Sequence, residues 1–200
     1  MTKIKICGIM REEDVGYVNE LLPDYVGFIF ANGRRRYITP ETALRFRTAL
    51  DKRIKTVGVF VDEDIDVICD IARSGAIGAI QLHGNETDEQ VRKIREMTGL
   101  TVLKAYAVDN AADVNEALAS PADYLLLDNG AGGTGESFDW DYLEDVDRLY
   151  ILAGGLTPEN VAAAIRKYCP YGVDVSTGVE TDGNKDYDKI RRFINAVRAV

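Results

Sequence analysis

The sequence predicts an α/β fold, a single (β/α)8 (TIM) barrel formed by residues 1–200, and three observations support this. Eight short apolar runs alternate with stretches of helical period, as expected for a parallel sheet covered by helices. The connections are short, with no Pro/Ser-rich linker between them. Finally, 200 residues of which 46% are hydrophobic suffice for one core and are few for two. Eight repeated units favour a closed barrel over an open sheet.

The predicted strands are the apolar or β-branched runs, in chain order IKIC, YVGFIF, IKTVGVF, IGAIQL, TVLKAY, YLLLD, LYILAG and GVDVS. The amphipathic segments between them predict helices at Glu12–Leu22, Pro40–Leu50, Asp62–Arg73, Thr87–Met97, Pro158–Tyr168 and Lys185–Val200. The helical pattern is weakest over Asp109–Ala119 and Phe138–Asp145, where we expect short or irregular segments.

Composition narrows the possible partners and the compartment. A net charge of −9 argues against nucleic acid and anionic membranes as partners. The first residues, MTKIKICG, lack the apolar core of a signal peptide, and no apolar run is long enough to span a bilayer. Cys7, Cys69 and Cys169 have no metal-ligand spacing, so we expect no metal site, reduced thiols and a cytoplasmic protein.

Two loops near the C-terminus predict a phosphate site. Functional groups of such barrels lie where strands end, and the last two predicted strands end at Gly154-Gly155 and at Ser176-Thr177-Gly178. Thr157 can cap the helix that follows the first of these loops, with Pro158 in its first turn. Backbone N–H groups at such positions bind anions. The ligand is therefore expected to carry phosphate.

Cys7 is a candidate for proton transfer at the end of the first strand. Side chains alternate along a strand, so Lys5 and Cys7 share one face. If that face is the barrel interior, Lys5 needs a partner, and Asp174 on the last strand is a plausible one because closure places the two strands side by side. A nearby ammonium would lower the pKa of the thiol. The alternative is that Cys7 only fills space, and for Cys69 and Cys169 this interpretation is favoured.

Asp128 is the second candidate, because it ends the apolar strand YLLLD. The alternative is an aspartate that orders the following loop. That loop, GAGGTGES, nearly matches a phosphate-binding P-loop, but Glu136 stands in the place of its lysine. A carboxylate there would repel a polyphosphate, which argues against ATP and favours a flexible lid.

Two further candidates could contact a ligand. Arg34, Arg35 and Arg36 follow the second strand, and at the mouth of a barrel in so acidic a chain we expect at least one guanidinium to bind a carboxylate. The alternative is a solvated loop. His83, in QLHG, is the only histidine, and it either orders a strand end or binds the ligand.

Taken together, the motifs resemble the phosphoribosylanthranilate isomerase family of tryptophan biosynthesis, essentially from end to end. The resemblance rests on the order and spacing of KICGI, GFIF followed by Arg36-Tyr37, VGVF, QLHG, LLLD with a glycine-rich loop ending in FDW, LAGGLTPENV and GVDVSTGVE. It implies an Amadori rearrangement of N-(5′-phosphoribosyl)anthranilate that needs neither metal nor cofactor.

The resemblance also implies residue roles. Asp128 would be the general acid, Cys7 the general base, and Arg36 the group that binds the anthranilate carboxylate. The phosphate would be bound by Gly154, Gly155, Ser176, Thr177 and Gly178, and His83 is counted among the candidate substrate-binding residues.

The chain departs from the family pattern in three places. Glu136 replaces a lysine common in the loop after the sixth strand, which puts lid closure and turnover in question. Thr177 replaces a serine but keeps the hydroxyl. The arginine triplet is richer than usual, and Arg36 is assigned because it precedes Tyr37.

Two alternative functions stay open at this point. The related isomerase of histidine biosynthesis performs the same rearrangement on a substrate with two phosphates, but it has an aspartate where this chain has Cys7. A non-catalytic barrel that binds a phosphorylated metabolite would lack the acid or the base, and both are present. No helix has an outer face apolar enough to distinguish a monomer from a homodimer.

Overall fold

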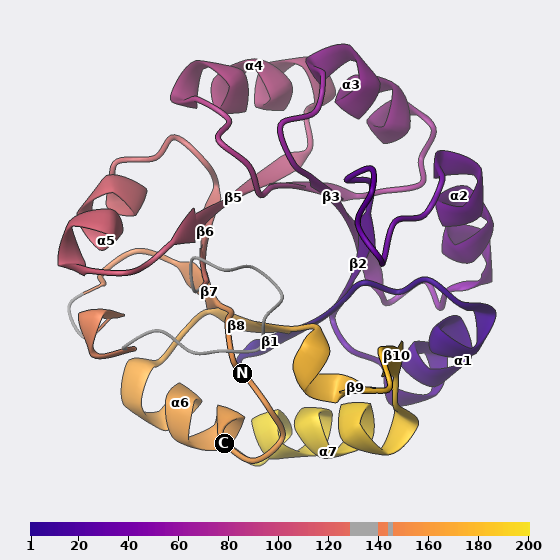
Figure 1. Cartoon of the computed structure of the whole chain (residues 1–200), viewed down its shortest axis with the longest axis vertical. Helices are drawn as coiled ribbons and strands as arrows, with labels where there is room; N and C mark the ends of the chain where they lie inside the picture. The colour runs from indigo at the N-terminus through magenta and orange to yellow at the C-terminus, as the bar shows by residue number, and fades with distance from the viewer. Residues whose placement is uncertain (129–139, 144–145) are drawn as a thin grey trace.

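The computed structural model describes residues 1–128, 140–143 and 146–200. Eight parallel strands form a closed barrel in chain order, with the first strand paired to the last (Figure 1). The strands are β1 (Lys3–Cys7), β2 (Tyr25–Ile29), β3 (Lys55–Phe60), β4 (Ala79–Leu82), β5 (Thr101–Ala107), β6 (Tyr124–Asp128), β7 (Tyr150–Leu152) and β8 (Gly172–Val175). The predicted barrel is confirmed.

Helices surround the barrel on its outside (Figure 1). They are α1 (Glu12–Leu21), α2 (Pro40–Ala49), α3 (Ile65–Arg73), α4 (Asp88–Thr98), α5 (Ala111–Leu118), α6 (Val161–Tyr168) and α7 (Tyr187–Arg198), with 3-10 turns η1 (Trp140–Leu143) and η2 (Thr177–Val179). The segments of weak helical pattern contain α5 and η1, which are short as expected. Among the described residues, no helix is long and apolar enough to cross a membrane.

Helix α6 begins later than the sequence predicts. Residues 158–160 form a turn rather than helix, and Asn160 is the residue that precedes the helix. The Thr157 hydroxyl accepts a hydrogen bond from the N–H of Glu159 at 3.2 Å, so it caps this turn. The prediction that Thr157 caps the helix, with Pro158 in its first turn, is therefore wrong. Both residues lie before the helix, which itself begins at Val161.

A small hairpin between β8 and α7 was not predicted. Strands β9 (Glu180–Thr181) and β10 (Asn184–Lys185) pair antiparallel around a turn at Asp182-Gly183. Both turn residues have positive φ, 50° and 79°, which is the conformation that an Asp-Gly pair favours in tight hairpins. Two-residue strands are too short to give a periodic pattern, but the Asp-Gly pair is a signal that was available in the sequence.

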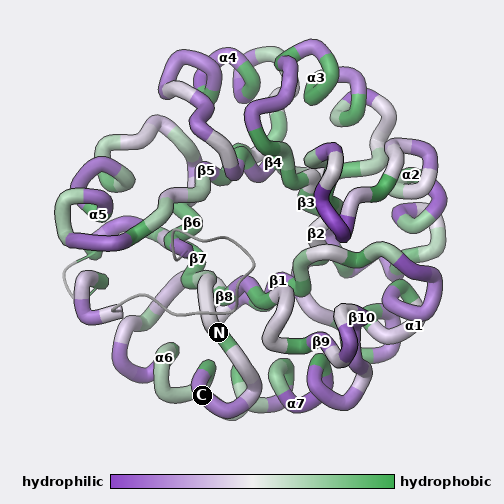
Figure 2. The backbone as a smooth tube through the Cα atoms, viewed as in Figure 1, coloured by the Kyte–Doolittle hydropathy of each residue, from purple (hydrophilic) through white to green (hydrophobic). Residues whose placement is uncertain are grey.

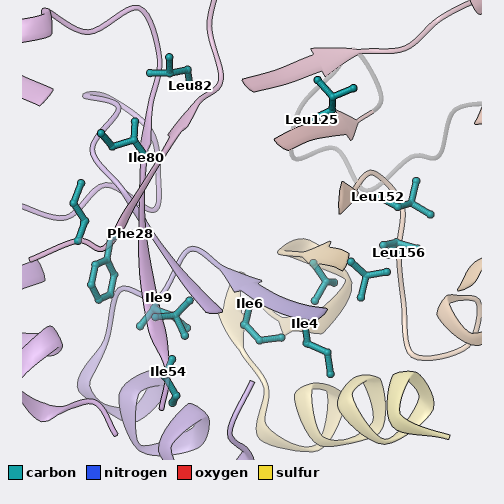
Figure 3. Close-up of a cluster of buried hydrophobic side chains, with 14 of the residues drawn as sticks. Ile4, Ile6, Ile9, Phe28, Ile54, Ile80, Leu82, Leu125, Leu152 and Leu156 are labelled. Carbon is teal, nitrogen blue, oxygen red and sulfur yellow. The ribbon is translucent and has the colours of Figure 1, made fainter. Parts of the chain in front are cut away.

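Two layers of apolar side chains fill the molecule. The larger layer lies between the strands and the helices and includes Ile4 and Ile6 of β1 (Figure 3). A smaller cluster fills the barrel, with members such as Val57, Leu103 and Leu126. Figure 2 shows hydrophobic residues concentrated on the strands and polar residues on the outer surface of the helices. Since Ile4 and Ile6 face the helices, Lys5 and Cys7 face the barrel interior.

Candidate functional site

The C-terminal ends of the strands enclose a cavity of about 300 Å³. Its lining includes the candidates Cys7, Arg36, His83 and Asp128. A smaller pocket of about 50 Å³ adjoins it and is lined by the predicted phosphate-binding residues Gly154, Gly155, Ser176, Thr177 and Gly178. Asp128, Asp174 and Ser176 line both spaces. The structure therefore brings all the candidate residues of the sequence to one mouth of the barrel.

Lys5 and Asp174 form the buried ion pair that the strand pattern predicts. They are register partners on β1 and β8, and Lys5 Nζ lies 2.9 Å from Asp174 Oδ2. Their side chains are only 2% and 9% exposed. Burial opposes the charge on Lys5, but Asp174 and Cys7 outweigh it and raise the pKa of the lysine. The pair therefore places a permanent positive charge beneath Cys7.

The expectation that Lys5 lowers the thiol pKa of Cys7 is wrong in its net sign. Burial of Cys7, which is 7% exposed, raises the pKa of the thiol above its ordinary value. Lys5 opposes this shift but does not overcome it. Desolvation disfavours the thiolate more strongly than one ammonium, itself paired with Asp174, can favour it. Without a bound ligand, Cys7 is a neutral thiol at neutral pH.

Arg36 reaches the cavity by crossing the end of β1. It passes over Gly8, whose φ of 82° and missing side chain leave the room, because a Cβ there would lie 2.5 Å from Arg36 Cδ. The side chain of Arg36 is 13% exposed, against 49% for Arg35. Both arginines contact the same carboxylate, that of Glu180. Arg34, Arg35 and Arg36 all line the cavity, and Arg36 is the one whose side chain is mostly buried there.

His83 is half-buried between a glutamine and the candidate acid. Its Nδ1 lies 2.8 Å from Gln81 Nε2, and its Nε2 lies 3.7 Å from Asp128 Oδ2. Burial, with a smaller effect of Lys5, lowers the pKa of His83 to about 4. The ring is therefore neutral at neutral pH.

Three polar residues at the site were not found by sequence reasoning. Gln81 is a buried polar residue in the apolar run IGAIQL, and this contrast was its only signal. Its Oε1 has no hydrogen-bond partner among the described residues. Glu180 and Lys185 lie on the hairpin that was also missed. Glu136 and the segment Gly130–Ser137, predicted to be a lid, lie outside the described residues.

The two predicted phosphate-binding loops contact each other at Gly178. A Cβ at this position would lie 1.9 Å from the backbone oxygen of Leu156, in the loop after β7. The neighbouring Ser176 hydroxyl donates a hydrogen bond to the backbone oxygen of Cys7 at 3.1 Å. The loops after β7 and β8 and the end of β1 are therefore fixed together, with backbone groups around one small pocket.

We expect Gly178→Ala to raise KM at least about tenfold with a smaller change in kcat. The added methyl group forces the two loops apart, and each lost hydrogen bond to a charged phosphate weakens binding by about 1.5–3 kcal/mol. Steady-state kinetics measure the effect, and Gly16→Ala is the control, because a Cβ at Gly16 meets nothing within 4 Å. An unchanged KM would show that the phosphate does not bind between these loops.

The fold and the site define a class: a TIM barrel with glycine-rich loops, a thiol and a carboxylate at its C-terminal mouth is built like a sugar-phosphate isomerase. The sequence model of the family "N-(5'phosphoribosyl)anthranilate (PRA) isomerase" matches residues 4–196, and the chain belongs to this family. Among the described residues, no group of three or more His, Cys, Asp or Glu side chains could hold a metal ion.

Similar proteins carry the same description. The N-(5'-phosphoribosyl)anthranilate isomerase of Endomicrobium trichonymphae is 44% identical over 204 residues, covering 100% of both chains. That of Desulforudis audaxviator is 47% identical over 206 residues, covering 99% of this chain and 98% of its own. The crystal structure of phosphoribosyl anthranilate isomerase from Thermotoga maritima matches with a TM-score of 0.90 and 41% identity over 100% of both chains. Between the functions that the sequence left open, these matches favour the isomerase of tryptophan biosynthesis.

Proposed function

We propose that the cavity is where this isomerase of tryptophan biosynthesis converts N-(5′-phosphoribosyl)anthranilate into 1-(2-carboxyphenylamino)-1-deoxyribulose 5-phosphate. The observation that carries the proposal is the position of Cys7 and Asp128 at the ends of β1 and β6, lining one cavity with an anion-binding group on each side. A structure with 41% identity and a TM-score of 0.90 is a phosphoribosyl anthranilate isomerase in complex with reduced 1-(o-carboxyphenylamino)-1-deoxyribulose 5-phosphate.

The substrate has two anionic ends, and the site offers two places for them. Arg36 binds the anthranilate carboxylate by a charge-assisted hydrogen bond. The loops at Gly154-Gly155 and at Ser176-Thr177-Gly178 bind the phosphate through backbone N–H groups and hydroxyls. The sugar then lies between them, over Cys7 and Asp128.

The reaction needs one acid and one base. Asp128, as the acid, protonates the furanose ring oxygen, and the ring opens to a protonated Schiff base. Cys7, as the thiolate, then removes the proton from C2′, which gives an enolamine that tautomerises to the ketone product. Neutral His83 lies beside the carboxyl group of the acid, with its Nε2 3.7 Å from Asp128 Oδ2. Atoms and charge balance, because one proton is added and one is removed.

We also infer the setting in which the chain works. It acts on a small phosphorylated molecule without nucleic acid or membrane, as a monomer or a homodimer, in the cytoplasm. The net charge of −9 and the scattered cysteines support this. One matched structure is described as monomers generated from the dimeric isomerase of Thermotoga maritima, so both states occur for that protein.

The test is a fluorescence assay with freshly generated phosphoribosylanthranilate. We expect an enzyme-dependent loss of the anthranilate-type emission that exceeds the loss in a control without enzyme. A folded protein that binds the reduced product analogue but causes no such loss would instead be a phosphometabolite-binding barrel.

A further inference from the structure

A buried carboxylate stands among three cations at the rim of the cavity. The side chain of Glu180 is 6% exposed. Its Oε1 lies 2.7 Å from Arg36 Nε and 2.8 Å from Lys185 Nζ, and its Oε2 lies 3.0 Å from Arg36 Nη2 and 2.6 Å from Arg35 Nη2. The contact with Arg36 is bidentate, which fixes the plane of the guanidinium group.

Lys185 extends the same network to the phosphate site. Its side chain is 1% exposed, and its Nζ donates to the backbone oxygen of Ser176 at 2.9 Å and to the Ser176 hydroxyl at 3.3 Å. Lys185 and Glu180 are register partners in the hairpin of β9 and β10, so the hairpin itself holds them together. Glu180 and Lys185 thereby connect Arg36, at the predicted carboxylate site, with Ser176, at the predicted phosphate site.

The charges of this network agree with a role in binding anions. Burial lowers the pKa of Lys185, but the two guanidinium groups alone outnumber the one carboxylate, so the network has an excess of positive charge in a chain whose net charge is −9. Burial alone would raise the pKa of Glu180, but Arg36 and Lys185 lower it to about 2, so it is ionised at neutral pH. Glu180 occupies Nε and Nη2 of Arg36, and within the described part of the chain no hydrogen bond involves Nη1, so this edge can bind a ligand.

We propose that Glu180, held by Lys185, is a positioning residue that orients Arg36 toward the substrate carboxylate and keeps it at a fixed distance from the phosphate loop at Ser176. The proposal rests on the proposed function, because it assigns the ligand groups that Arg36 and Ser176 bind. Two alternatives are incompatible with this proposal. In the first, the hairpin has a purely structural role; in the second, Glu180 merely competes with the substrate for Arg36.

The first test is Glu180→Gln, which keeps the shape of the side chain and removes its charge. Arg36 then loses its fixed orientation, and we expect KM to rise about tenfold to a hundredfold with kcat changed by less than about threefold. Two ligands are compared by calorimetry: reduced carboxyphenylamino-deoxyribulose phosphate, and the matching phenylamino compound without the carboxylate. Only the first is expected to bind more weakly to the variant.

The control and a second variant keep the test decisive. Glu12→Gln is the matched control, because Glu12 also lies near an arginine, Arg45, but is 77% exposed on α1. If Glu180→Gln does not fold, Glu180→Asp replaces it: the charge beside Lys185 remains, but the shorter side chain cannot make the bidentate contact with Arg36. The same selective loss is expected.

Four other outcomes have distinct meanings. Equal weakening of both ligands by the Glu180 variants would overturn the proposal in favour of a structural role, and tighter binding of the carboxylate ligand would show competition. Unchanged binding of both would also overturn it. If the wild-type protein neither turns over phosphoribosylanthranilate nor binds the carboxylate ligand, the proposed function itself fails. This result comes from the wild-type protein alone, so it is distinguishable from a failure of the positioning role of Glu180.

Lys185→Met tests the link to the phosphate loop. The variant removes the donor to Ser176, so both ligands are expected to bind about tenfold or more weakly, in contrast to Glu180→Gln. Lys52→Met, on an exposed lysine, is the control. If Lys185→Met binds the ligand without the carboxylate as tightly as the wild type, the hairpin does not position the phosphate site.

Discussion

The Cys7→Ser variant is expected to lose about 10²–10⁴-fold in kcat while it keeps its fold and its affinity for the reduced product analogue. Serine replaces sulfur by oxygen at nearly the same place, but a hydroxyl is a far weaker acid than a thiol and supplies no base at neutral pH. The position of Cys7 supports this expectation, because the residue ends β1, lines the cavity and lies near the ammonium of Lys5.

Steady-state kinetics and calorimetry measure the two parts of this expectation. Cys69→Ser is the matched control, because Cys69 is also buried but lies on α3, outside the residues that line the cavity. A Cys7→Ser variant with wild-type kcat would remove Cys7 as the base. A variant that loses affinity and kcat together would indicate that Cys7 shapes the cavity instead.

The pH dependence gives an independent check on the same residue. Burial raises the pKa of Cys7, so the thiolate fraction, and with it the rate at which iodoacetamide alkylates Cys7 in the free protein, is expected to rise with pH through the neutral and mildly alkaline range. His83, with a pKa of about 4, is neutral throughout and adds no further rise there. An alkylation rate that is flat between pH 6 and pH 9, both taken as approximate limits, would contradict a raised pKa of Cys7.

The barrel was predictable because each of its units has a signal within a few residues. Apolar strands and amphipathic helices alternate, and closure then fixes which strands are neighbours. This explains why the pair of Lys5 and Asp174 could be predicted although 169 positions separate them. Strand alternation places Lys5 inside the barrel, and the need to neutralise a buried charge selects Asp174 on the adjacent strand.

The contacts of Arg36 could not be predicted in the same way. Its partner Glu180 is 144 positions away and lies on a hairpin of two-residue strands, which leave no periodic pattern. The direction of the Cys7 pKa shift was predicted wrongly for another reason. Burial raises the pKa of the thiol and the charge of Lys5 lowers it, and the sequence indicates that both effects are present but not which is larger.

Asp128→Asn is expected to lower kcat by about 10²–10⁴-fold with little change in KM. Asparagine keeps the size of the side chain and its contact with His83, but it cannot give up a proton to the ring oxygen of the sugar. The position of Asp128 supports this role: it ends β6, its side chain is 13% exposed, and it lines both the main cavity and the phosphate pocket. Ring opening would then limit the rate.

The control for this variant lies at the other end of the same strand. Asp123 precedes β6, accepts a hydrogen bond from the N–H of Val102 at 2.8 Å, and lines neither space at the mouth. Asp123→Asn is therefore expected to affect stability rather than kcat. If Asp128→Asn turns over at the wild-type rate, the acid is another group, and His83, which lies beside Asp128, is the next residue to replace.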